Sequence, residues 1–350
     1  MRAHAENSPI PLLNIARFDA GDSERDAFLA QLRAAAHEVG FFYLAGHGAE
    51  PDLMRDLMLV ARRFFALPDA DKLAIEMVNS PHFRGYNRIA QEHTRGQRDW
   101  REQIDIGAER PALPRHRESP AWARLQGPNQ WPAALPELRT VVTRWQTAAI
   151  QVLERLLRAF ALALGQAGDA LEPLYRDEPH QLIKLIRYPG RDATAGDQGV
   201  GAHKDADLIT LLLQDGQGGL QVESRRGWIE VPPHDGTFVV NIGELLELAS
   251  DGYLRATMHR VVTPPAGVER ISAAFFLGAR LDATVPLLRL PAALAAHARG
   301  PERDPNNPLF REVGQNYLKG RLRSHPDVAQ RHYGDLVEVV APAESFSGNV

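Results

Sequence analysis

Apolar residues recur every three or four positions in three segments of the chain, a spacing typical of amphipathic helices. The segments are 23–39, 51–67 and 138–164. Ser23 and Pro51 stand where helices favour a capping residue and a first-turn proline. The single apolar stripe of 138–164 indicates a scaffold helix that backs a sheet, with a dimer seam as the alternative.

After Gly165 the pattern changes to short runs rich in β-formers, separated by Gly, Pro and Asp turns. The runs are LIKLIRYPG, LITLLLQD, GLQVES, GWIEVPP, GTFVVNIGE, HRVVTPP and RISAAFFLGA. So many short strands within roughly a hundred residues indicate a barrel or a double-sheet jelly roll. The earlier run FFYLAGHG predicts one more strand that ends in a glycine turn.

The remaining segments follow neither pattern. Between 81 and 136 the chain is rich in Pro, Arg, Gly and isolated aromatic residues, which predicts a long irregular connection, a kind of segment that often carries function. The segment 316–333 has a helical pattern that Pro326 should break. Lys319, Arg321 and Arg323 in this segment indicate either a closing helix that favours an anionic substrate or a solvated charged face.

Composition limits the partners and the chemistry. The chain of 350 residues has a formal net charge of −4 and no long basic run, so we expect a small-molecule ligand rather than nucleic acid or an anionic membrane surface. It contains no cysteine, so any metal must bind histidine and carboxylate. The N-terminal stretch lacks an apolar signal region, and we expect a cytoplasmic monomer, with a dimer as the alternative.

A candidate metal site lies in the segment AHKD. Alternate side chains of a strand share a face, so His203 and Asp205 point the same way, and His259 opens the later run HRVV. Two histidines and one carboxylate form the facial triad of non-haem Fe(II) oxygenases, which leaves part of the coordination sphere open. We therefore predict an iron site at His203, Asp205 and His259.

A candidate carboxylate site follows the metal site along the chain. Arg270 and Ser272 stand two apart in a predicted strand, so they also share a face. A guanidinium binds a carboxylate through two parallel hydrogen bonds, and a hydroxyl adds another donor. Beside an iron site, this pair is suited to the distal carboxylate of a 2-oxo acid whose other end chelates the metal.

The chain resembles the isopenicillin N synthase-like family of Fe(II)- and 2-oxoglutarate-dependent oxygenases over nearly its whole length, and we interpret it as a bacterial member. The resemblance is carried by HKDADLITLLLQDGQGGLQV, WIEVPPHDGTFVVNIGELLELASDGYLRATMHRVVTP and RISAAFFLGA, and in the first half by GFFYLAGHG, FRGY and IDIG. It implies an α+β fold in which a double-stranded β-helix, or jelly roll, is flanked by N-terminal helices, a long scaffold helix and a C-terminal helical segment.

The resemblance also implies roles for individual residues. His203, Asp205 and His259 would bind Fe(II), and Arg270 and Ser272 would hold 2-oxoglutarate, which reacts with O2. Tyr188 matches a tyrosine that hydrogen-bonds the co-substrate in many relatives, and a core aromatic is its alternative role. Two residues earlier many relatives carry an asparagine, where this chain has Ile186. The turn at 241–244, NIGE, resembles a family turn before a short helix, which we interpret as structural.

Phe83, Arg84 and Tyr86 fall where relatives place residues at the mouth of the active site, and Phe276 shares the face of Ser272 and could line the cavity. Packing is the alternative role of all four. The resemblance divides the chain into an N-terminal α-rich region (8–115), a connection with the scaffold helix (116–175), the jelly-roll core (176–290) and a C-terminal helical extension (291–350).

We therefore expect an Fe(II)- and 2-oxoglutarate-dependent dioxygenase that hydroxylates, desaturates or cyclises a small organic molecule and releases succinate and CO2. One alternative is an oxidase or cyclase that uses iron without an oxo acid. Another is an enzyme that cleaves 2-oxoglutarate itself to ethylene or succinate. A catalytically silent module that senses an oxo acid or a metal is the alternative outside enzymes.

Overall fold

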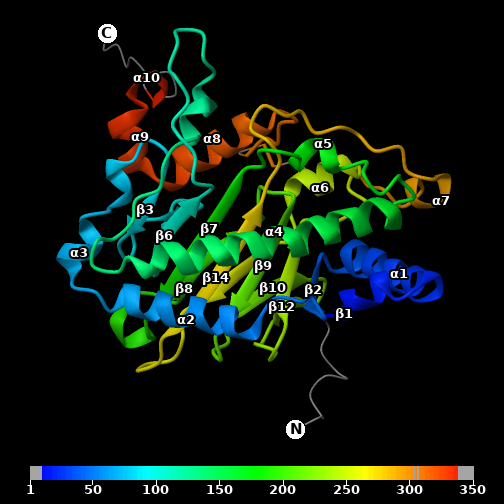
Figure 1. Ribbon diagram of the computed structural model, residues 1–350, viewed down its shortest axis with the longest axis horizontal. Coiled ribbons are helices and arrows are strands. Elements are labelled where there is room, and N and C mark those ends of the chain that lie inside the picture. Colours follow the sequence, from blue (N-terminus) through cyan, green and yellow to red (C-terminus); the bar gives the residue numbers. More distant parts are fainter. Residues whose placement is uncertain (1–9, 303, 306, 338–350) are drawn as a thin grey trace, which may run out of the picture.

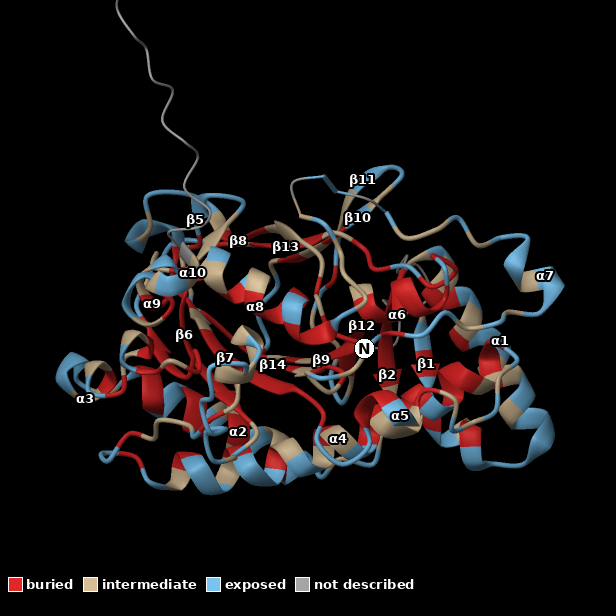
Figure 2. Cartoon of the chain, turned by 90° about the horizontal axis from the view of Figure 1, so that it is seen from above, coloured by how far each residue is buried: buried red, intermediate tan, exposed pale blue. Residues whose placement is uncertain are grey.

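The computed structural model describes residues 10–302, 304–305 and 307–337. Helices, a large sheet and a small sheet form three successive layers (Figures 1 and 2). The large sheet has the order β1 (Leu12–Asn14), β2 (Phe41–Ala45), β12 (Phe238–Ile242), β9 (Ile209–Gln214), β14 (Arg270–Leu277), β7 (Gln181–Tyr188), β6 (Glu102–Gly107) and β3 (Gly85–Asn87). The small sheet has the order β11 (Gly227–Glu230), β10 (Leu220–Ser224), β13 (His259–Val262) and β8 (Gln198–His203).

The two facing sheets confirm the predicted jelly-roll core with flanking helices. The helices are α1 (Asp22–Glu38), α2 (Pro51–Phe65), α3 (Asp69–Leu73), α4 (Glu137–Ala163), α5 (Glu172–Tyr175), α6 (Glu244–Ala249), α7 (Ala292–Ala295), α8 (Val313–Ser324), α9 (Pro326–His332) and α10 (Gly334–Val337). The short 3₁₀ turns are η1 (Ile15–Asp19), η2 (Met77–Asn79), η3 (Ala121–Leu125) and η4 (Arg191–Ala193).

Two separate apolar cores hold the layers together. The larger core lies between the helices and the outer face of the large sheet, and Trp145 and Phe160 of α4 are fully buried in it. The smaller core lies between the sheets and includes Tyr188, Val200 and Val261. Burial of apolar surface on both faces therefore fixes which side chains of each strand point into the jelly roll.

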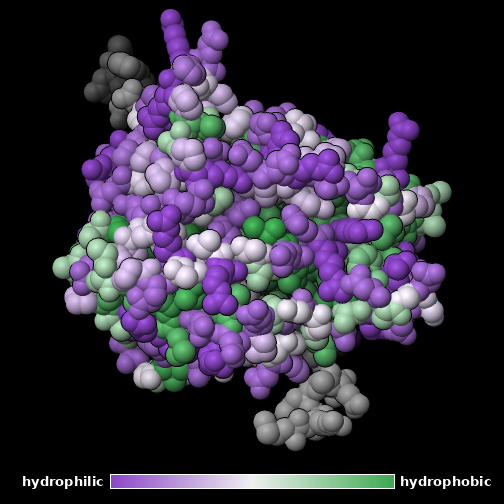
Figure 3. Space-filling model, viewed as in Figure 1, coloured by the Kyte–Doolittle hydropathy of each residue, from purple (hydrophilic) through white to green (hydrophobic). Residues whose placement is uncertain are grey.

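The long helix α4 packs its apolar stripe onto the large sheet, which confirms the scaffold interpretation (Figure 1). Its outer side belongs to a face of the molecule that is mainly polar, with apolar residues scattered among the helices (Figure 3). None of the helices in the described part of the chain is both long and apolar enough to cross a membrane.

The segment 81–136 is less irregular than its sequence indicated. It contains β3, the short pair β4 (His93–Thr94) and β5 (Gln97–Arg98), and β6, which lies between β3 and β7 in the large sheet. The prediction of an irregular connection was wrong for β6, whose inward side chains, Gln103 and Asp105, are polar and bind buried polar groups. Ile104 and Ile106 alternate with them and are buried on the other face, but this alternation is short and lies in a segment otherwise rich in Pro, Arg and Gly.

The C-terminal helices lie across one end of the two sheets (Figure 2). As expected, the helical segment is interrupted at Pro326, which begins α9 directly after His325. Tyr317 of α8 reaches the barrel, and a Cβ atom added at Gly278 would lie only 1.9 Å from its hydroxyl. The bare backbone of Gly278 therefore leaves room for α8 to approach the sheet.

Candidate metal centre and active site

His203, Asp205 and His259 converge at the end of the small sheet. His203 ends β8 and His259 begins β13, and the two residues are direct partners in the antiparallel ladder. Their Nε2 atoms each lie 3.5 Å from Asp205 Oδ1. One ligand atom from each residue falls within 4.8 Å of the other two, so the three side chains could hold a single metal ion.

The imidazole rings are oriented to present a free nitrogen. His203 Nδ1 lies 2.8 Å from the carbonyl oxygen of Gly201, and His259 Nδ1 lies 3.1 Å from that of Thr257. An Nδ1–H that donates to a carbonyl leaves the Nε2 lone pair for a metal, as is usual for metal-binding histidines. Both Nε2 atoms point toward Asp205.

Two neighbouring side chains fix the carboxylate of Asp205. Its Oδ2 accepts hydrogen bonds from Thr210 Oγ1 at 2.6 Å and Asn241 Nδ2 at 2.7 Å. Oδ1 is therefore left to face the histidines. Although burial raises the pKa of Asp205, His259 and His203 hold it well below its usual range, so the carboxylate stays ionised. Two imidazoles and one carboxylate without a thiolate suit Fe(II) with open coordination positions.

Asn241 and Thr210 were not identified as site residues from the sequence. Asn241 was interpreted as part of a structural turn, and it does stand on β12 shortly before α6. Its hydrogen bond to Asp205 depends on the pairing of strands β9 and β12, which places Asn241 directly opposite Thr210. No local sequence signal indicates this pairing.

The structure also places Arg270, Ser272 and Tyr188 together inside the jelly roll. Arg270 is 1% exposed, and it donates to Gln214 Oε1 at 2.9 Å and Ser272 Oγ at 3.4 Å. Its guanidinium carbon lies 4.9 Å from the centre of the Tyr188 ring. Within the described residues no carboxylate lies within ion-pair distance of Arg270, and its Nε has no hydrogen-bond partner.

A buried cation without an acidic partner is costly, so this arrangement fits a site that receives an anionic ligand. Arg270 and Ser272 are partners of Tyr188 and Ile186 in the antiparallel pairing of β14 with β7. Ile186, at the position of the asparagine of many relatives, is buried in the apolar core between the sheets.

Of the four candidate substrate residues, two lie on the inward face of the jelly roll or beside a cavity, and two pack among other side chains. Phe276 is partly exposed on β14, directly opposite Thr210, and it shares the inward face of Ser272. Arg84 is buried beside a cavity. Tyr86 faces the helices, where its hydroxyl donates to Glu102 at 2.5 Å, and Phe83 packs against Tyr333 with ring centres 5.4 Å apart. The contacts of Tyr86 and Phe83 give a substrate role no support.

A buried charge network joins the jelly roll to the C-terminal helices. Lys184 of β7 lies 2.8 Å from Glu92, which also binds Arg101 at 2.8 Å. Arg321 of α8 lies 2.8 Å from Asp105 of β6. Because Arg321 is buried and paired in this network, the solvated-face interpretation was wrong for this residue.

His325 makes this network sensitive to pH. It is 1% exposed, its ring contacts Asn87 and Arg321, and Glu92 lies 3.7 Å away. The pKa of His325 is lowered to about 4, mainly by burial. The positive charges of Arg321 and Lys184 also lower this pKa, while the carboxylates of Glu92 and Asp105 raise it.

We expect acid to destabilise the protein partly through His325. The pKa of His325 is lower in the folded protein than in the unfolded chain, so the unfolded chain binds the proton first as the pH falls. The contribution of neutral His325 to the free energy of unfolding is therefore complete above about pH 6.5 and is lost as the pH falls toward 4. A His325→Gln variant should therefore show a weaker dependence of unfolding free energy on pH across this window. Urea unfolding at several pH values measures it, and identical slopes for variant and wild type would refute the assignment.

Comparisons with known proteins agree with this geometry. Residues 10–134 match the model described as non-haem dioxygenase in morphine synthesis N-terminal, and residues 179–279 match the 2OG-Fe(II) oxygenase superfamily. A 2-oxoglutarate-dependent dioxygenase from Dothideomycetidae sp. (strain 11243) is 34% identical over 99% of this chain and 97% of that protein. A homoarginine-6-hydroxylase from Glycine max is 35% identical over 73% of this chain and 78% of its own.

A solved structure shares the fold. A full-length Neurospora crassa protein, crystallised in complex with alpha-KG and 5-formyluracil, superposes with a TM-score of 0.72 at 25% identity, covering 90% of this chain and 96% of that one. The relatives extend over both the helical N-terminal half and the jelly roll. The chain therefore belongs to the Fe(II)- and 2-oxoglutarate-dependent dioxygenases, oxidoreductases that act on small organic molecules.

Proposed function

We propose that His203, Asp205 and His259 hold the catalytic Fe(II), while Arg270 and Ser272 hold the distal carboxylate of 2-oxoglutarate. The observation that carries this proposal is the convergence of two Nε2 atoms on Asp205 Oδ1, while Oδ2 is occupied by Thr210 and Asn241. Tyr188 lies against the Arg270 guanidinium and limits its movement.

When bound, Fe(II) supplies the redox chemistry that couples oxidative decarboxylation of 2-oxoglutarate to oxidation of the substrate by O2. The residues of the chain provide binding and orientation. The triad would hold the metal through two imidazoles and one carboxylate, a ligand set that leaves coordination positions for the co-substrates. Arg270 receives the co-substrate inside the buried jelly roll, where charge-assisted hydrogen bonds are strong.

Hydroxylation is the outcome we propose for the substrate, with desaturation or cyclisation as other outcomes of the same chemistry. The hydroxylase relative from Glycine max supports this choice. Phe276 is the best-supported substrate residue, because it is partly exposed on the inward face of β14 and lies opposite Thr210, a partner of Asp205.

Two other uses of the same iron site give different products. An oxidase that works without an oxo acid consumes O2 and forms no succinate, while cleavage of 2-oxoglutarate alone forms ethylene or succinate without an oxidised substrate. We expect purified protein with Fe(II), 2-oxoglutarate and a substrate to form about one succinate per O2 consumed, because hydroxylation places one oxygen atom in succinate and the other in the hydroxylated product. Oxygen uptake that persists without 2-oxoglutarate and forms no succinate would favour the oxidase, and ethylene or succinate without any change in a broad substrate panel would favour 2-oxoglutarate cleavage.

Several finer assignments are also proposals. We place the chain in the isopenicillin N synthase-like group as a bacterial member, acting as a cytoplasmic monomer on a small molecule, with neither nucleic acid nor a membrane as partner. The net charge of −4 supports the last point. The four-part division of the chain is proposed with the boundaries given above, although its outermost residues, 8–9 and 338–350, lie outside the described residues.

A further inference from the structure

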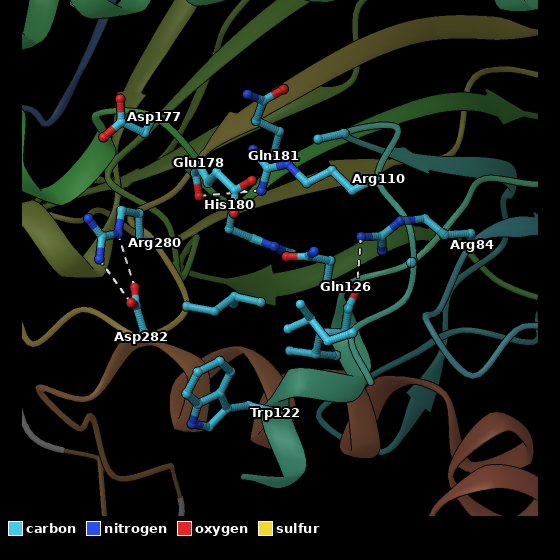
Figure 4. Close-up of a pocket in the computed structure, with 15 residues that line it drawn as sticks. Arg84, Arg110, Trp122, Gln126, Asp177, Glu178, His180, Gln181, Arg280 and Asp282 are labelled. Carbon is cyan, nitrogen blue, oxygen red and sulfur yellow. Dashed lines mark hydrogen bonds and ion pairs between the residues drawn. The ribbon is translucent and has the colours of Figure 1, made fainter. Parts of the chain in front are cut away.

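A second polar site lies outside the proposed iron and 2-oxoglutarate positions. A cavity of about 390 Å³ is enclosed by residues that follow β6, by η3, and by the loops that precede β7 and follow β14 (Figure 4). Its lining includes Arg84, Arg110, Trp122, His180 and Arg280. None of the proposed iron ligands and none of the proposed 2-oxoglutarate residues line it.

Arg84 brings an unpaired positive charge to this cavity. The side chain is 3% exposed, and among the described residues its two terminal nitrogens donate only to the carbonyl oxygens of His82, Phe83 and Leu125. Its Nε has no partner, and no carboxylate of the described chain lies within ion-pair distance. Burial lowers the pKa of Arg84 to about 10, so the guanidinium is still charged at neutral pH.

The guanidinium of Arg84 lies against the backbone of Gly107. A Cβ atom added at Gly107 would lie 2.4 Å from Arg84 Nε and 2.5 Å from its Nη2. The glycine that ends β6 therefore makes the space in which the guanidinium lies. In Figure 4 the guanidinium of Arg84 points into the cavity, toward the side from which Arg110 and Gln181 approach.

The other charges of the lining leave the deep part of the cavity positive. Arg110 is partly exposed, and in the part of the chain that the structure describes it donates only to the carbonyl oxygens of Glu178 and Pro179. Arg280 differs, because it forms a paired contact with Asp282 at 2.9 Å. Asp177, Glu178 and Asp282 are exposed, so their carboxylates are better screened by solvent than the buried Arg84.

We propose that this cavity binds an organic acid, with its carboxylate on Arg84 and Arg110 and its apolar part against Trp122. A buried, uncompensated guanidinium is costly unless an anion pairs with it, and a carboxylate accepts several charge-assisted hydrogen bonds at once. Leu125 and Leu281 extend the apolar wall beside Trp122. The site would be distinct from the 2-oxoglutarate position at Arg270.

The cavity adjoins the proposed metal centre through two aromatic rings in contact. His180 lines the cavity, and its ring centre lies 4.2 Å from that of Tyr317. The hydroxyl of Tyr317 donates to Asp207, two residues after Asp205. A ligand in the cavity would therefore be a neighbour of the active site, separated from it by His180 and Tyr317.

The test uses phenylacetate as the probe and phenylacetamide, its uncharged analogue, as the ligand control. Calorimetric titration would be done anaerobically on the full chain with Fe(II) and saturating 2-oxoglutarate, so that the Arg270 position is filled. We expect phenylacetate to bind and phenylacetamide to bind at least ten-fold more weakly, because hydrogen bonds between charged groups contribute roughly 1.5–3 kcal/mol. Equal binding of the two probes, or displacement of phenylacetate by excess 2-oxoglutarate, would overturn the proposal without affecting the proposed iron site.

Three variants locate the binding site. Arg84→Met should weaken phenylacetate binding by roughly ten-fold or more, and Arg110→Gln by several-fold. Arg280→Gln is the matched control, since it removes a charge of the same wall that Asp282 already neutralises, and it should leave the affinity unchanged. If Arg84→Met does not fold, the partly exposed Arg110→Gln decides. Wild-type affinity in Arg110→Gln, or a larger loss in Arg280→Gln, would contradict the assignment.

Discussion

Asp205→Ala should reduce the iron content of the purified protein from about one ion per chain to near zero and abolish turnover, because it removes the only carboxylate of a three-ligand site. The fold should survive, since Asp205 belongs to neither apolar core and its partners Thr210 and Asn241 are neutral. Metal analysis, circular dichroism and an activity assay on the same sample measure the three effects. His203→Ala should behave in the same way.

Asp207→Asn is the matched control for this experiment. Asp207 is as buried as Asp205 and stands two residues later, but its side chain binds Tyr317 instead of facing the histidines. We expect this variant to retain its iron. Stoichiometric iron and near-native activity in Asp205→Ala would refute the triad, and loss of iron from Asp207→Asn alone would show that the ligand had been assigned to the wrong carboxylate.

Arg270→Leu should weaken 2-oxoglutarate binding by about ten-fold to a few hundred-fold, since it removes charge-assisted hydrogen bonds worth roughly 1.5–3 kcal/mol each. Iron affinity should hardly change, because no ligand is lost. The affinity is measured by anaerobic calorimetric titration of 2-oxoglutarate into the Fe(II) protein.

Arg270→Lys separates the shape of the guanidinium from its charge. A lysine keeps the charge but cannot reproduce the planar fork, so it should recover little of the lost affinity. Full recovery by lysine would mean that charge alone matters at this position. Unchanged affinity in Arg270→Leu would remove the support for the carboxylate site.

Much of the fold could be predicted because the sequence carries its pattern locally. Helices α1, α2 and α4 show helical spacing, and the jelly-roll strands appear as short β-rich runs between turns. Strand β6 was missed because the alternation of Ile104 and Ile106 with Gln103 and Asp105 is short and lies in a segment rich in turn residues. Its polar side turns inward, where Asp105 is bound by Arg321 of α8, a contact that no local window contains.

The residues of the candidate site could likewise be predicted where the pattern is local, and not where it depends on strand pairing. His203 and Asp205 are two apart where one strand ends, and Arg270 and Ser272 are two apart on another strand, so simple alternation indicated that each pair shares a face. Asn241 was interpreted as structural because its contact with Asp205 depends on strand pairing.

Arg84 was predicted near the substrate, but its unpaired charge could be recognised only once its surroundings were known. Arg321, in contrast, is a buried arginine that does have an acidic partner, Asp105, but the two residues are 216 positions apart in the sequence.

In the proposed function, 2-oxoglutarate chelates an iron held by His203, Asp205 and His259. Anaerobic titration of 2-oxoglutarate into the Fe(II) protein, followed through the visible charge-transfer band of the chelate, tests this most directly. We expect the band to grow and to saturate at about one 2-oxoglutarate per iron in the wild type, as expected for one chelated ion per site, and to be absent from Asp205→Ala. An iron-loaded wild type that shows no band at saturating 2-oxoglutarate would contradict the proposed function, and an oxidase independent of the oxo acid would then describe the protein better.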